Sequence, residues 1–380
     1  MESIKGAHVT KVFGNAFKGK KVLVTGHTGF KGSWLSMWLT ALGADVIGYS
    51  AYFPSIPCNF KVCGLDKRLT HVEGDIRNLD TLISVFKKYK PEIVFHLAAQ
   101  PLVRESYKNP KLTFDTNIGG TVNVLECIRS ATNVKAAVII TSDKCYRNME
   151  WLWGYKETDI MGGDDPYSAS KGCAEIICNS YIKSFFPKGK NLPRVATTRA
   201  GNVIGGGDWA IDRIVPDSVR AFSKGKQVII RNPNATRPWQ HVLEPLSGYL
   251  WLAAHLLNSA ELHGEAFNFG PDHKVDKSVA ELLAAFSTYW GEKAKWKFID
   301  KKDNRKESTL LKLSCDKALN LLDWSATLSF EDTIRFTAEW YTSYYGTKKE
   351  MFDYSMTQIK DYTNKALGLN NAWAHGIFND

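Results

Sequence analysis

The sequence predicts an α/β protein: a doubly wound, Rossmann-type parallel sheet with a smaller C-terminal lobe. Three observations support this fold class. In the first half, short runs rich in β-branched residues alternate with longer helical patterns. A turn with three glycines follows the first run, and beyond residue 200 the chain changes to loops rich in Gly, Pro, Asn and Arg. Alternating strands and helices are typical of βαβ units, in which helices cover both faces of a parallel sheet.

Six runs are expected to form the sheet, and in chain order they lie at residues 20–25, 44–50, 68–75, 92–99, 136–142 and 194–201. Amphipathic segments such as residues 79–89 are expected to connect them as helices. In the second half, residues 226–231 predict a short strand and residues 278–290 predict a helix.

No fixed-period repeat or low-complexity linker separates the two halves, so we expect the chain to cross between them more than once. The sheet domain is assigned to residues 16–200, with returning segments near 240–267 and 330–347. The smaller lobe is assigned to residues 201–239 and 268–329.

The composition is typical of a globular protein and gives no sign of a membrane, disulfide-bonded or metal-binding protein. The chain has 380 residues, 44% hydrophobic and 23% charged, which is ordinary for a globular protein. No run of about 18 apolar residues and no N-terminal apolar segment is present, so we expect a cytoplasmic protein that does not enter a membrane. The seven cysteines are scattered without a Cys-x-x-Cys pair, which favours reduced thiols over disulfides or a metal site.

The formal net charge of +10 would permit nucleic-acid binding, but the charge is spread along the chain except for a cluster at residues 294–306. A solvated surface is the expected role of that cluster, and attraction of an anionic small substrate is the alternative. No basic motif with base-reading or stacking geometry is apparent, so no nucleic-acid partner is expected.

The glycine turn predicts a dinucleotide site. It opens a helix directly after the first strand, a position in which the glycines permit a tight turn and close approach of the backbone to a pyrophosphate. The residues expected to contact the cofactor here are Gly26, Thr28, Gly29, Phe30 and Gly32. The second strand ends in Ser50 rather than in the acid that usually marks NAD, and no arginine stands beside it for a 2′-phosphate, which leaves NAD as the favoured cofactor. Asp75 is expected to bond the adenine amino group, to cap a helix, or both.

Two pairs of residues indicate chemistry. Tyr167 and Lys171 are one helical turn apart, so a nearby cation is expected to lower the pKa of the phenol and let it act as a general base, while the lysine bonds the cofactor ribose. Residues 162–166 precede them as a turn that would cap the helix. Asp143 and Lys144 stand where the fifth strand ends, either as an acid and a base at the mouth of a cleft or as a solvated ion pair.

The glycine turn, HLAAQ at 96–100, NIGGTVNVLE at 117–126 and the Tyr-Lys pair resemble the extended short-chain dehydrogenase/reductase family from about residue 16 onward. This resemblance implies NAD as cofactor, with further contacts from Ile76, Ala98, Ala99, Gln100 and Asn117. Residues 26–35, 96–107, 141–148, 154–175 and 199–209 together are similar to the branch of nucleotide-sugar 4,6-dehydratases that acts on CDP-glucose. Related dehydratases carry Ser/Thr-Asp-Glu after the fifth strand, and this branch resembles the Ser142-Asp143-Lys144 variant found here.

The resemblance implies a mechanism that forms CDP-4-keto-6-deoxyglucose, a precursor of deoxysugars. Tyr167, assisted by Ser142 and Lys171, removes the proton of the sugar 4-hydroxyl as NAD+ takes the C4 hydride, which later returns to C6. Lys144 then takes the C5 proton and Asp143 protonates the departing 6-hydroxyl. A neutral lysine is needed for that step, so its pKa should be depressed; alternatively, a charged Lys144 stabilises the C4 enolate.

On the substrate side, the resemblance implies that Asn202 bonds a phosphate and that Arg237 pairs with the pyrophosphate. The alternative role of Asn202 is a helix cap, and that of Arg237 is a surface ion pair. Further candidates for base, ribose or phosphate contacts are Arg104, Arg213 and Glu307. Helices at 112–130 and 165–186 resemble the pair that forms a dimer interface in this family, which implies a homodimer or homotetramer.

Three other functions remain open. A nucleotide-sugar 4-epimerase shares the fold, cofactor and Tyr-Lys pair, but it needs no acid and base for water loss, so Asp143-Lys144 favours a dehydratase. A 4,6-dehydratase for another nucleotide sugar is the second alternative. A non-catalytic dinucleotide sensor would not need both Tyr167 and Lys171.

Overall fold

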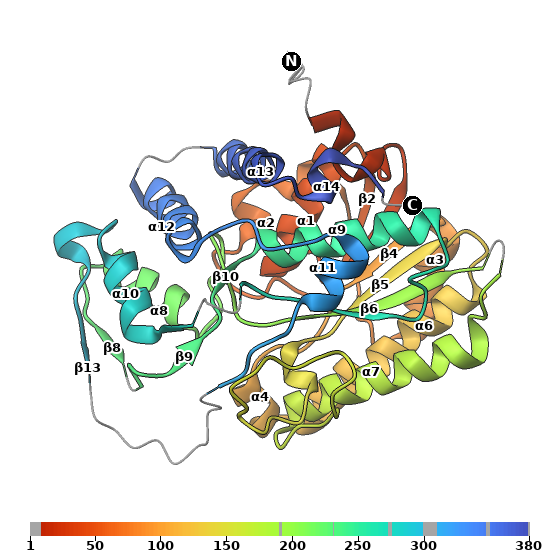
Figure 1. Ribbon diagram of the computed structural model, residues 1–380, viewed down its shortest axis with the longest axis horizontal. Coiled ribbons are helices and arrows are strands. Elements are labelled where there is room, and N and C mark those ends of the chain that lie inside the picture. Colours follow the sequence, from red (N-terminus) through yellow and green to blue (C-terminus); the bar gives the residue numbers. More distant parts are fainter. Residues whose placement is uncertain are drawn as a thin grey trace.

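A seven-stranded parallel sheet forms the centre of the protein (Figure 1). The computed structural model describes residues 9–189, 192–230, 232–272, 276–298, 310–346 and 350–378. In chain order the strands of this sheet are β1 (Lys21–Thr25), β2 (Asp45–Ser50), β3 (Thr70–Glu73), β4 (Ile93–His96), β5 (Ala136–Ile140), β6 (Arg194–Ala200) and β11 (Ala266–Phe269). All six predicted strands are confirmed, and β11 adds an edge strand that pairs with β6.

The strand order is β11-β6-β5-β4-β1-β2-β3, so the direction of winding reverses between β1 and β4. In doubly wound sheets, ligands bind outside the carboxyl ends of the strands at this reversal. The paired strands are in register there, with Val22 opposite Ile93 and Thr25 opposite His96. The glycine turn follows β1, and residues 97–102 follow β4, so both loops lie at the predicted ligand edge.

Helices cover both faces of the sheet (Figure 1). Along β1, Val22 and Val24 face one core cluster while Leu23 faces the other, because successive strand side chains point to opposite faces. The first face packs against α1 (Phe30–Ala41) and α9 (Leu243–Asn258). The second face packs against α3 (Leu79–Tyr89), α6 (Gly120–Ser130) and α7 (Pro166–Phe185).

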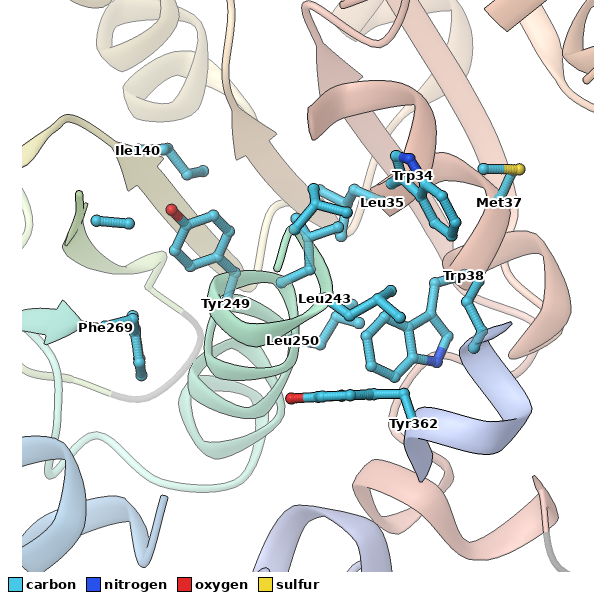
Figure 2. Close-up of a cluster of buried hydrophobic side chains, with 14 of the residues drawn as sticks. Trp34, Leu35, Met37, Trp38, Ile140, Leu243, Tyr249, Leu250, Phe269 and Tyr362 are labelled. Carbon is cyan, nitrogen blue, oxygen red and sulfur yellow. The ribbon is translucent and has the colours of Figure 1, made fainter. Parts of the chain in front are cut away.

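The core on the first face is aromatic. Figure 2 shows Trp38 of α1 next to Leu243 and Leu250 of α9, with Trp34 of α1 above them and Tyr362 of α13 (Met351–Gly368) beneath Trp38. All five side chains are fully buried, and burial of each contributes on the order of 1.5–3 kcal/mol. This packing fixes α1, and with it the glycine turn, against the sheet.

The smaller lobe lies to one side of the sheet (Figure 1). It contains two short strand pairs, β8 (Val228–Ile230) with β13 (Trp296–Phe298) and β9 (Thr236–Arg237) with β12 (Lys277–Ser278). Its helices are α8 (Ile214–Phe222) and α10 (Val279–Ser287). The predicted strand at 226–231 and helix at 278–290 are therefore confirmed. A capping box between Ser278 and Glu281 starts α10 by satisfying two backbone N–H groups.

The remaining elements complete the fold. They are η1 (Val9–Asn15), α2 (Asn59–Val62), η2 (Leu65–Lys67), α4 (Val103–Lys108), α5 (Pro110–Phe114), η3 (Asp115–Gly119), η4 (Asp143–Cys145), β7 (Val203–Ile204), β10 (Gln240–His241), η5 (Gly291–Lys293), α11 (Asp316–Leu322), α12 (Phe330–Gly346) and α14 (Ala372–His375). All seven cysteine thiols are free. Within the described ranges, none of the helices has the length and apolar character needed to cross a membrane.

Candidate active site

The glycine turn has the geometry of a backbone cradle. Gly26 has φ +76°, and a Cβ on it would lie 2.7 Å from the backbone nitrogen of Ala98. A Cβ on Gly32 would overlap the carbonyl oxygen of Gly26. Gly29 precedes α1 without a side-chain cap, which leaves the first N–H groups of that helix available to an anion. The turn therefore needs glycine at Gly26 and Gly32 and presents backbone donors at one end of the sheet.

The end of β2 is occupied by a small polar cluster. Ser50 is buried, and its hydroxyl lies 3.0 Å from Nδ1 of His27 and accepts a hydrogen bond from the N–H of Thr28 at 3.4 Å. Nε2 of His27 in turn lies 2.8 Å from Nδ1 of His71. Burial, together with the nearby His71, lowers the pKa of His27 to about 3, so this imidazole is neutral. The position where many relatives of this fold carry an acid thus presents a hydroxyl.

Asp75 and Ile76 follow β3. The Asp75 carboxylate accepts hydrogen bonds from the backbone N–H and the guanidinium of Arg77, and these bonds lower its pKa. The helix α3 is capped by Asn78, whose Oδ1 accepts from the N–H of Thr81, so the alternative of Asp75 as the cap is wrong. Ile76 is buried. An open hollow of about 790 Å³ lies here, lined by Asp75, Arg77, Asn78, Leu79, Asp115, Gly119 and Asn123.

Gln100 and Asn117 tie the loop after β4 to α7. Oδ1 of Asn117 accepts from the N–H of Gln100 at 2.8 Å, and its Nδ2 donates to the Gln100 carbonyl at 3.1 Å and to Oγ of Ser170 at 2.8 Å. The single π-helical turn η3 presents Asn117 at this junction. Ala98 and Ala99 lie in the same loop, where the Ala98 N–H donates to Oγ1 of Thr25 at 3.2 Å. These contacts hold the predicted cofactor residues against the helix that carries Tyr167 and Lys171.

Ser142, Asp143, Tyr167 and Lys171 meet at the carboxyl end of β5, and all four are buried. Oγ of Ser142 donates to Oδ1 of Asp143 at 2.8 Å and accepts from the backbone N–H of Lys144 at 3.2 Å. Helix α7 begins at Pro166 with Asp165 as its cap, as the turn at 162–166 predicted. The ammonium of Lys171 makes no hydrogen bond with any described residue.

Burial reverses one expectation about this cluster. It raises the pKa of the Tyr167 phenol to about 12, which is opposite to the lowering predicted from Lys171. Ser142 and Arg213 oppose the rise, while Asp143 reinforces it. Burial also lowers the pKa of Lys171 to about 8. Desolvation disfavours the charged form of each group, and a one-turn spacing in the sequence does not reveal its size.

Lys31 is a site residue that was not predicted from the sequence. It lies in the first turn of α1 between Gly29 and Gly32, is half-buried, and places Nζ 6.0 Å from the ring centre of Tyr249. Burial lowers the pKa of its ammonium to about 8; Asp143 opposes this shift, while Arg213 and Lys171 add to it. The sequence feature that could have identified Lys31 is its position inside the glycine turn, where the backbone must approach a ligand.

The predicted substrate residues lie around the same opening. Arg213 forms an ion pair with Asp208 at 2.9 Å and is close enough to Tyr167 to influence its pKa. Arg104 lies on α4 and pairs with Asp212 at 2.9 Å, which links the sheet domain to the loop before α8.

Two further candidates stand on short strands. Asn202 precedes β7 rather than starting a helix, so its alternative role as a helix cap is wrong, and its side-chain amide makes no hydrogen bond within the described ranges. Nη1 of Arg237, on β9, donates to the Thr236 carbonyl at 2.7 Å. Glu307 lies outside the described residues.

These residues fit a dinucleotide. The cradle at Gly26 and Gly32 leaves no room for a side chain, the N-terminus of α1 offers uncapped donors, and the buried Lys171 side chain makes no hydrogen bond with the described residues. The charge of Glu175 favours this ammonium, but a buried cation without a hydrogen bond is costly, so a polar ligand group beside Lys171 would stabilise it.

Comparisons with known proteins agree with this geometry. The family described as GDP-mannose 4,6-dehydratase matches residues 23–337. A protein of Salmonella typhimurium named CDP-glucose 4,6-dehydratase is 46% identical over 92% of this chain and 97% of its own length.

Among solved structures, an epimerase from Methanothermobacter thermautotrophicus superimposes with a TM-score of 0.76, at 26% identity over 90% of this chain and 97% of that one. A dTDP-glucose 4,6-dehydratase from Bacillus anthracis, solved with NAD, gives a TM-score of 0.70 at 24% identity over 89% and 100% of the two chains, and it supports the fold alone. The resemblance predicted from the motifs is confirmed. The chain belongs to the GDP-mannose 4,6-dehydratase family of nucleotide-sugar dehydratases and epimerases, within the extended short-chain dehydrogenases/reductases.

Proposed function

We propose that this protein is an NAD-dependent 4,6-dehydratase that converts CDP-D-glucose to CDP-4-keto-6-deoxy-D-glucose. The observation that carries the proposal is the meeting of two functional pairs at one strand end: Tyr167 and Lys171 on α7, and Asp143 and Lys144 after β5. The first pair suits oxidation at C4, and the second suits loss of water across C5 and C6. The relative named CDP-glucose 4,6-dehydratase supports the choice of nucleotide.

The cofactor is assigned to the glycine turn. Gly26, Thr28, Gly29, Phe30 and Gly32 would hold the pyrophosphate, and Asp75 and Ile76 would hold the adenine end. The remaining contacts are assigned to Ala98, Ala99, Gln100, Asn117, Tyr167 and Lys171. When bound, NAD+ supplies an acceptor for the C4 hydride and later returns that hydride to C6.

Tyr167 is the proposed base for the sugar 4-hydroxyl. Because the pKa of the phenol is raised to about 12, the phenol is protonated at neutral pH in the protein alone. Proton removal by its oxygen therefore depends on positive charge nearby. Arg213 already opposes the rise in the pKa of the phenol, and we assign the same role to Lys171, one helical turn away on α7. The Ser142 hydroxyl is proposed to hydrogen-bond the oxygen of the sugar 4-hydroxyl.

Asp143 and Lys144 are the proposed acid and base of dehydration. Asp143 is buried and held by Ser142, a position from which it can protonate the departing 6-hydroxyl. Lys144 is half-buried and its backbone is held by the same hydroxyl, so its side chain can reach C5 from the neighbouring position. In the alternative role, a charged Lys144 stabilises the enolate formed at C4.

The lobe at 201–239 and 268–329 is proposed to hold the nucleotide. Asn202 and Arg237 are assigned to the phosphates, and Arg104, Arg213 and Glu307 to base, ribose or phosphate. Arg104 and Arg213 already pair with Asp212 and Asp208, so a diphosphate would compete with those carboxylates. We also propose a homodimer or homotetramer formed through α6 and α7, because α7 exposes Ile176 and Phe185.

Mass spectrometry of the products from CDP-, dTDP-, UDP- and GDP-glucose, each with NAD+ supplied, tests the function. Loss of one water from CDP-glucose alone is the expected result. Loss of water from another sugar nucleotide instead would change the substrate, and conversion to the galactose isomer without a mass change would make the protein a 4-epimerase.

A further inference from the structure

A buried carboxylate lies behind the proposed catalytic residues, and the mechanism above does not use it. Glu175 follows Lys171 by four residues on α7, and Tyr167 precedes Lys171 by four, so the three side chains share one helix face. Glu175 is only 5% exposed. A buried charge is costly unless it is paired and hydrogen-bonded, so its partners indicate what it holds in place.

The Glu175 carboxylate accepts four hydrogen bonds from three side chains. Nε and Nη2 of Arg199 donate to its two oxygens at 3.0 and 2.9 Å, which is a bidentate pair. Oγ1 of Thr197 donates at 2.8 Å, and Oγ1 of Thr141 donates to the same carboxylate. Arg199 and Thr197 belong to β6, and Thr141 follows the last residue of β5. One side chain of α7 therefore fixes the carboxyl ends of two sheet strands.

Thr141 directly precedes Ser142 and Asp143, so its hydrogen bond to Glu175 sets where those two residues stand relative to Tyr167 and Lys171. We infer that Glu175 is a positioning residue: its buried pair with Arg199 and its bond from Thr141 hold the Ser142-Asp143 segment against the Tyr167-Lys171 face of α7. The role in turnover rests on the proposed dehydratase function, whereas the placement of Lys171 beside Glu175 does not.

The network continues toward the C-terminal part of the chain. Nη1 of Arg199 donates to Oη of Tyr146 at 2.6 Å, and that phenol donates to Oδ1 of Asn268 at 2.8 Å. Nδ2 of Asn268 donates to the Ser314 carbonyl at 3.1 Å. The segments around Asn268 and Ser314 are thereby joined to the same carboxylate, which makes Glu175 the meeting point of α7, β5, β6 and β11.

Glu175 also acts on Lys171 through its charge. Burial lowers the pKa of Lys171, and Glu175 is the largest influence in the opposite direction. The other titratable groups around this ammonium are Cys145, Cys178, Lys31 and the neutral His96. Loss of the Glu175 charge should therefore favour the neutral form of Lys171.

The variant Glu175→Gln, with Glu157→Gln as matched control, tests the inference. Glu157 belongs to the same network, since its carboxylate accepts from the N–H of Asn268 at 2.8 Å and its carbonyl from Arg199 at 3.0 Å. NMR titration of ¹³C-labelled lysine in the full chain, with Lys171→Arg for assignment, gives the midpoint of Lys171. We expect that midpoint to fall by about one pH unit in Glu175→Gln and to stay unchanged in Glu157→Gln.

Turnover of CDP-glucose with NAD+ is the second readout. In Glu175→Gln we expect kcat to fall roughly ten- to hundredfold, because the catalytic groups are displaced from their reacting positions. KM should change less than about threefold, because the residues proposed to bind the substrate keep their positions. A folded variant with unchanged kcat and an unchanged Lys171 midpoint overturns the inference.

Glu175→Gln leaves Arg199 buried without its partner and can fail to fold. Thr141→Val keeps both charges and removes one hydrogen bond to the carboxylate, so it serves as the second variant. We expect its kcat to fall by roughly three- to tenfold with the Lys171 midpoint unchanged, and wild-type kcat in this variant would overturn the positioning role. If the wild-type protein does not act on CDP-glucose, the proposed function fails, while the NMR titration still tests the link between Glu175 and Lys171.

Discussion

Burial sets the protonation states of individual side chains in the candidate site. The Tyr167 phenol and the Lys171 ammonium both have pKa values displaced toward their neutral forms, to about 12 and about 8. A lysine with a pKa near 8 still carries its charge at pH 7, so it can favour ionisation of a phenol that burial opposes. Activity should therefore decline as the pH rises through about 8, because Lys171 loses its proton.

Tyr167→Phe should lower kcat by roughly 10²- to 10⁴-fold, since the variant removes the proposed base and leaves the ring in place. The free energy of unfolding should change by less than about 1 kcal/mol. Steady-state kinetics with CDP-glucose and urea unfolding check both values. Retention of wild-type kcat would assign proton removal from the 4-hydroxyl to another group.

Lys144→Met separates the two roles proposed for this residue. If Lys144 is the base at C5, the variant should still oxidise C4 but should form little dehydrated product, and therefore little material with deuterium at C5 from heavy water. Proton NMR of the product formed in deuterated buffer measures this. Normal incorporation at C5 with slower turnover would leave Lys144 only the electrostatic role at the enolate.

Among the elements, α7 must begin at a fixed residue, because its first turn carries Tyr167. Asp165 accepts from the N–H of Ser168 at 3.0 Å, and Pro166 has no N–H to satisfy. Asp165→Ala should lower the free energy of unfolding by about 1 kcal/mol. Asp164→Ala, at the exposed neighbouring position, is the control and should change it by less than about 0.5 kcal/mol. Equal effects in urea unfolding would contradict the assignment of the cap.

Most of the elements could be predicted because their signals are local. The six strands, the glycine turn and the capped helix at Tyr167 each follow from a few neighbouring residues. The edge strand β11 was not predicted, because its place in the sheet depends on pairing with the distant strand β6.

The parts of the site that the sequence did not predict depend on contacts between distant segments. The pair of Arg104 with Asp212 joins α4 to a loop of the other lobe, and Glu175 meets strands from two places in the chain. The pKa of Tyr167 depends on burial by the whole fold, which outweighs the one-turn spacing from Lys171. The position of Lys31 beside Asp143 likewise requires α1 to be docked against the sheet.

At the scale of the whole molecule, buried histidines should make stability depend on pH. Burial lowers the pKa of His27, His96 and His241 to about 3 each, whereas their ordinary value is 6.5. Below pH 6.5 the unfolded chain therefore binds protons that the folded chain does not, so the free energy of unfolding falls as the pH falls, by about 1.4 kcal/mol per pH unit for each group.

Glu244 acts in the opposite direction. Burial raises its pKa to about 7, so between pH 7 and about 4.5 the folded chain binds a proton that the unfolded chain does not, which stabilises the fold as the pH falls. Burial also lowers the pKa of His255 to about 4. With four histidines against one carboxyl group, we expect a net loss on the order of 4 kcal/mol between pH 6 and pH 5. Urea unfolding across this range measures it. Glu244→Gln should steepen the loss, and a flat profile in the wild-type protein would contradict the histidine assignment.

The proposed dimer makes a second prediction at this scale. Ile176 is 59% exposed on α7, and a carboxylate there would be desolvated by a facing helix. Ile176→Asp should shift the protein to monomers in sedimentation velocity, whereas Ile211→Asp, at a 62% exposed position outside α7, should not. Unchanged assembly in Ile176→Asp would place the interface elsewhere.

In the proposed reaction, oxidation at C4 and loss of water across C5 and C6 occur in one site, and the hydride taken from C4 returns to C6 of the same sugar. CDP-glucose labelled with deuterium at C4 tests it most directly, with mass spectrometry and NMR of the product formed in ordinary water. We expect a product that has lost one water and carries the deuterium at C6. Deuterium lost to solvent, or retained at C4 in the galactose isomer, would contradict it.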